Sequence, residues 1–65
     1  MIEELETMTA NIMVAKGKVS DAEIAAQKLP PSEAVDNLRD SIDSCLVEIG
    51  WVLEYIKMVA KAAQP

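Results

Sequence analysis

Cys45 is the only thiol in this 65-residue sequence, which also contains no histidine. Nucleophilic catalysis requires a base beside the nucleophile, and a reactive thiolate requires a cationic neighbour. No basic residue lies one helical turn from Cys45 on its own side of the predicted helix, which favours a small buried side chain over a reactive thiol. With no Gly-rich phosphate loop either, the sequence predicts a protein that is not an enzyme and binds no metal or cofactor.

Four carboxylates are the second group of residues with chemical potential. Their spacing of three and four residues predicts a ridge on the outer side of one helix. Such a ridge could bind a cation or a basic protein, or imitate a nucleic-acid backbone. The simpler interpretation is a solvated surface, because acids near a helix N-terminus are stabilised by the helix dipole. This acidic ridge consists of Glu33, Asp36, Asp40 and Asp43.

The helix that must position both groups is predicted from a heptad repeat over residues 33–63. Apolar residues recur there at alternating steps of three and four, a pattern typical of a helix packed against another helix. Val35 begins the series at heptad position a and Leu38 at position d, which places Cys45 at a buried d position. The full a and d set is Val35, Leu38, Ile42, Cys45, Ile49, Val52, Ile56, Val59 and Ala63.

A second, less apolar heptad repeat predicts a helix over residues 2–29. Gly17 lies inside it, and glycine costs a helix interior about 1 kcal/mol relative to alanine. Ser20 and Glu23 could also begin a new helix as a capping box. The heptad register nevertheless passes Gly17 unchanged, which favours one continuous helix. Its a and d residues are Leu5, Met8, Ile12, Ala15, Val19, Ala22, Ala26 and Leu29.

Residues 30–32 are predicted to form the turn between the two helices. Pro30 disfavours helical geometry in the residue before it, and Pro31 extends this restriction. Ser32 is a good N-cap for the second helix. Because so short a connection makes neighbouring helices antiparallel, the sequence predicts a helical hairpin as a single domain over residues 1–65.

The C-terminal half of the second helix has an apolar arc too wide for one neighbour. The arc covers roughly half of the helix circumference, against ~100° for a one-sided amphipathic helix. Exposed apolar patches of this size mark interaction surfaces, and a second copy of the hairpin would cover this one by forming a four-helix bundle. The candidate interaction surface is Leu46, Trp51, Leu53, Tyr55 and Met58.

Length and charge limit the remaining functions. A chain of 65 residues builds only a small core, and its single cysteine allows no intrachain disulfide, so oligomerisation is the expected source of added stability. The net charge of −5 repels nucleic acid and anionic lipid. The acidic start lacks the basic region of a signal peptide, and charges within residues 46–63 argue against a membrane span. We therefore expect a soluble, cytoplasmic protein.

Together these features predict an all-α, two-helix antiparallel hairpin that forms a homodimeric four-helix bundle with coiled-coil-like packing. We expect a small non-catalytic interaction or oligomerisation module, a regulator or adaptor whose partners are a second copy and another protein. The alternative is an acidic mimic of nucleic acid that binds a basic DNA- or RNA-binding protein. The first hypothesis places affinity on the aromatic and methionine side chains, and the second places it on the acidic ridge.

Overall fold

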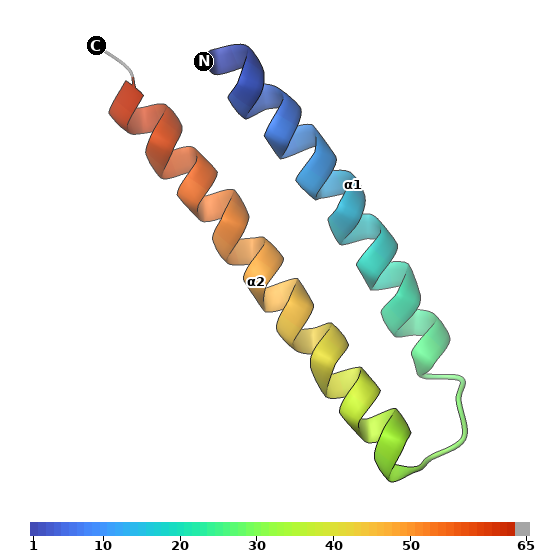
Figure 1. Cartoon of the computed structure of the whole chain (residues 1–65). Coiled ribbons are helices and arrows are strands. Elements are labelled where there is room, and N and C mark those ends of the chain that lie inside the picture. The colour runs from blue at the N-terminus through green and yellow to red at the C-terminus, as the bar shows by residue number, and fades with distance from the viewer. Residues whose placement is uncertain (64–65) are drawn as a thin grey trace.

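Two long antiparallel helices make up the part of the chain that the structure, a computed structural model, describes, residues 1–63. They are α1 (Ile2–Ala26) and α2 (Glu33–Ala63), and they lie side by side with both chain ends opposite the turn (Figure 1). No strand occurs in this range. The predicted all-helical hairpin is thus confirmed. Because the hairpin is a single layer of two helices, 53 Å long, each helix has one neighbour only.

Helix α1 passes through Gly17 without a break, as the unchanged heptad register predicts. The backbone there has no positive φ angle, and a Cβ atom built on Gly17 would meet nothing within 4 Å. The glycine therefore serves no close contact within the hairpin. The potential capping box at Ser20 and Glu23 does not begin a new helix.

The end of α1 lies three residues before the predicted one. After Ala26 the backbone tightens, with the amides of Lys28 and Leu29 donating to the carbonyls three residues earlier at 3.1 Å. The physical reason is Pro30, which pushes Leu29 out of helical geometry and so unwinds the last turn from its C-terminal side. Residues 27–32 form the connection.

Helix α2 begins where the N-cap chemistry of Ser32 places it. The Ser32 hydroxyl accepts a hydrogen bond from the Val35 amide at 3.1 Å, and its carbonyl accepts one from the Asp36 amide at 2.9 Å. These bonds satisfy two amides that have no partner inside the helix. Helix α2 then runs over the predicted residues, 33–63.

The two helices meet along a seam that differs from the predicted one. On α2, the less exposed residues recur at positions a and e of the heptad rather than at a and d. The expectation that α2 packs on its neighbour through Leu38, Cys45, Val52 and Val59 is therefore wrong for the single chain. The α2 side of the seam is Val35, Arg39, Ile42, Leu46, Ile49, Leu53, Ile56 and Ala60.

Side-chain size in the middle of α2 favours this seam. One neighbouring helix can cover only one edge of a half-circumference apolar arc. In the middle of α2, rotation toward position e buries Leu46 and Leu53 in place of the smaller Cys45 and Val52. At the two ends of α2, position e holds Arg39 and Ala60. Burial of the larger side chains removes more apolar area from water, at roughly 25 cal/mol per Å². The hairpin therefore takes the leucine edge and leaves the other edge uncovered.

Candidate interaction surface

The d positions of both helices lie on one side of the hairpin, which we call the open face. In an antiparallel pair joined through a and e positions, the d positions of both helices point to the same side. Large side chains on it remain solvent-accessible, with Met8 49%, Leu38 44% and Val59 45% exposed. The open face is made of Met8, Ala15 and Ala22 from α1 and Leu38, Cys45, Val52 and Val59 from α2.

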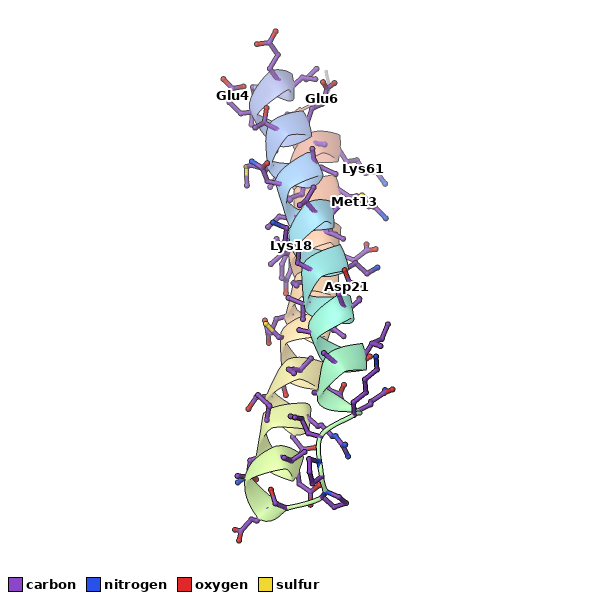
Figure 2. The ribbon with its side chains drawn as sticks, turned by 90° about the vertical axis from the view of Figure 1, so that its right-hand side faces the viewer. Glu4, Glu6, Met13, Lys18, Asp21 and Lys61 are labelled. Carbon is purple, nitrogen blue, oxygen red and sulfur yellow. The ribbon has the colours of Figure 1, made fainter. Side chains whose placement is uncertain are left out.

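A groove near the chain ends confirms that the two rows of d residues share a side. Met8 of α1 lines it together with Val52 and Val59 of α2, and its volume is about 340 Å³. In Figure 2, which views the hairpin edge-on, Glu4 and Lys18, which flank the d row of α1, lie toward one broad side of the hairpin, while Glu6 and Met13 lie toward the other. The open face thus lies on one broad side of the hairpin.

The hairpin contact divides the predicted interaction surface into two groups. Leu46 and Leu53 turn toward α1 and are half-buried in the seam. Trp51, Tyr55 and Met58 are exposed, and the Trp51 and Tyr55 rings stack with centroids 6.0 Å apart. Tyr55 also lines the groove of the open face, whereas Trp51 and Met58 lie farther round the helix. The five residues therefore do not form one patch on a single hairpin.

Cys45 is exposed in the single chain, contrary to the burial expected at position d. It lies in the middle of the α2 row of the open face because the seam uses position e instead. Within the hairpin nothing covers the thiol, so its burial would require a second molecule on this face.

All four carboxylates of the acidic ridge are exposed, and none takes part in a salt bridge within residues 1–63. The ridge follows the outer side of the first three turns of α2, close to the hairpin turn. Among the described residues, no group of three or more His, Cys, Asp or Glu side chains is arranged to hold a metal ion. The ridge is therefore exposed to solvent along its length.

Two carboxylates come together across the helices, a contact that the sequence did not reveal. The neighbouring Asp43 carboxyl raises the pKa of Glu23 above its usual value of 4.5, first through a hydrogen bond between the two groups. Partial desolvation and the charge of Asp43 act in the same direction. Only one of these two acids belongs to the acidic ridge, and its partner is on α1.

Arg39 is the structural residue that sequence reasoning missed. Its guanidinium donates to the Ala26 carbonyl, with the shorter N–O distance 3.2 Å, and to the carbonyls of Gln27 at 3.2 Å and Leu29 at 3.4 Å. Helix α1 has no basic residue in its own last turn, so α2 supplies the cation at this C-terminus. The available signal was that the only arginine of the chain lies at heptad position e, which Leu46 and Leu53 occupy farther along the helix.

No family model, no curated protein and no solved structure matches this chain. Neither helix, over residues 1–63, is long and apolar enough to cross a membrane. Function must therefore be argued from the hairpin surface alone.

Proposed function

We propose that the chain is a non-catalytic oligomerisation module whose hairpins pair through their open faces into a homodimeric four-helix bundle. The observation that carries this proposal is the lack of a core in one copy. Among the described residues only Ala26 and Ile56 are buried, at 4% and 7% exposure. A single hairpin has a seam but no second layer, and domains are normally built from at least two layers around one core.

The exposed area supports a partner of the size of a second copy. The chain exposes 5108 Å², whereas a compact monomer of 7.1 kDa is expected to expose about 4,100 Å². The excess of about 1,000 Å² is close to the ~800 Å² that each partner buries in a stable interface. The open face provides an apolar strip for this contact, and the polar residues beside it, among them Glu4, Lys18 and Glu48, suit an interface rim.

The acidic ridge supports the alternative function less well. Its four carboxylates are exposed on one side of α2, as a nucleic-acid mimic requires. Helix N-termini favour acids for structural reasons, however, and the ridge covers only one short segment.

Sedimentation equilibrium at micromolar concentration tests the proposal with two matched substitutions on α2. Wild-type protein is expected at twice the monomer mass of 7.1 kDa. Val52→Asp places a charge in the open face and should weaken the dimer at least a hundredfold, because burying an unpaired carboxylate costs several kcal/mol per subunit. Val47→Asp, on the outer side of the same helix, makes the same chemical change and should remain dimeric. A helical wild-type protein at the monomer mass would refute the proposal.

A further inference from the structure

We propose that the two hairpins stack open face to open face with their turns at opposite ends of the bundle, an inference that rests on the proposed dimer. The two-fold axis then lies in the interface, perpendicular to the helices, and each helix packs antiparallel on its own copy. The competing arrangement has both turns at one end and packs α1 on the partner's α2. Both arrangements bury the same face. Side-chain size and charge along the hairpin therefore decide between them.

The residues of the open face are spaced so that one copy of the face can be laid on a second copy. Met8 shares a groove with Val52 and Val59, so it lies level with a point midway between them. One heptad farther along α1, Ala15 is level with the midpoint of Cys45 and Val52. On α2, that midpoint is also the centre of the open-face row, which extends from Leu38 to Val59. A two-fold axis at this level therefore maps the open face onto itself in both helices.

This axis matches large side chains with small ones on α1. With the turns at opposite ends, Met8 meets the Ala22 region of the partner subunit. With the turns at the same end, Met8 would meet the bulky Val52 and Val59 region, and Ala22 would meet the region between Leu38 and Cys45. Protein interiors are close-packed, so the contact of Met8 with the small Ala22 is favoured over a contact of Met8 with two valines.

Charge favours the same arrangement. Residues 20–43, at the turn end, carry six carboxylates and only two basic side chains, Lys28 and Arg39. The opposite end, residues 1–12 and 52–63, carries four carboxylates, Lys57 and Lys61. The Met1 amino group and Glu4 form an ion pair there at 2.6 Å. Figure 2 shows Glu4, Glu6 and Lys61 near this same end of the hairpin.

Stacking with both turns at one end would bring the two more negative ends together. Bundle helices lie 8–10 Å apart, which is within the Debye length of about 10 Å at 0.1 M salt, so this repulsion would act across the interface. Opposite turns instead place each acidic turn end level with Lys57 and Lys61 of the partner subunit. The distribution of charge along the hairpin and the sizes of the facing side chains thus favour the same arrangement, with the turns at opposite ends.

Distances between spin labels distinguish the two arrangements by pulsed electron paramagnetic resonance. Cys45→Ala removes the native thiol, and Glu33→Cys then places one nitroxide at the turn end of each subunit. Opposite turns predict a separation of about 45 Å, from 31 residues in α2 at 1.5 Å each. Turns at the same end predict less than about 25 Å, since neighbouring helices are only 8–10 Å apart. Lys61→Cys provides an independent label at the other end, with about 38 Å expected for opposite turns.

A label at Val47→Cys, in the same Cys45→Ala background, serves as the matched control. It lies near the centre of the hairpin on its outer side, so both arrangements predict a short distance. A long distance at 33 and 61 with a short one at 47 supports the inference. Short distances at all three positions would overturn it and leave the dimer intact. A missing intersubunit distance at position 47, with helical protein at the monomer mass, would overturn both the inference and the proposed function.

Discussion

Removing the guanidinium of Arg39 should destabilise the end of α1 without changing the helical character of the rest of the chain. Arg39→Ala deletes the donors to three carbonyls that follow the last turn of α1. A hydrogen bond to a charged group contributes about 1.5–3 kcal/mol when buried and well aligned. The bonds here are long, at 3.2–3.4 Å, and two of the three acceptors are in exposed surroundings. Water can replace the arginine at those two carbonyls, so we expect a loss of only about 1–2 kcal/mol.

The assay is thermal and urea unfolding followed by circular dichroism, at one protein concentration because dimer stability depends on it. A loss of 1–2 kcal/mol corresponds to a fall in Tm of about 5–15 °C for a domain of this size. Arg39→Lys is the matched control, because it keeps the positive charge but loses the planar fork that reaches several carbonyls. It should recover part of the lost stability. Unchanged stability in Arg39→Ala would show that these hydrogen bonds do not hold α1 against α2.

Two further predictions concern Glu23 and Cys45. Because the pKa of Glu23 is raised in the folded state, its contribution to stability is present below pH 4.5 and is lost as pH rises through the raised pKa, so Glu23→Gln should stabilise the protein at pH 7 more than at pH 4. An equal effect of Glu23→Gln on urea unfolding at both pH values would contradict the contact with Asp43. Alkylation of Cys45 should be fast in dilute protein, where the thiol is exposed, and slow at concentrations where the open faces pair. Val52→Asp should react quickly at every concentration, and a wild-type rate independent of concentration would place Cys45 outside the interface.

Local chemistry made most of the secondary structure predictable. The bounds of α2 follow from the hydroxyl of Ser32 and the uninterrupted heptad repeat after it, and the continuity of α1 follows from the register on both sides of Gly17. These features act over a few neighbouring residues, so they are present in the sequence itself. The early end of α1 was harder to place, because it depends on how far the effect of Pro30 extends back along the helix.

Only the tertiary structure decided which edge of the apolar arc of α2 is buried. Positions d and e are adjacent in sequence but about 100° apart around a helix, and both are apolar in the C-terminal half of α2. Apolar residues spaced alternately by three and four are therefore compatible with either seam. In the folded hairpin, α1 packs on the edge of α2 that contains Leu46 and Leu53. The same rotation brings Arg39 to the end of α1 and Glu23 to Asp43, contacts between residues 13 and 20 positions apart that no periodicity within one helix can encode.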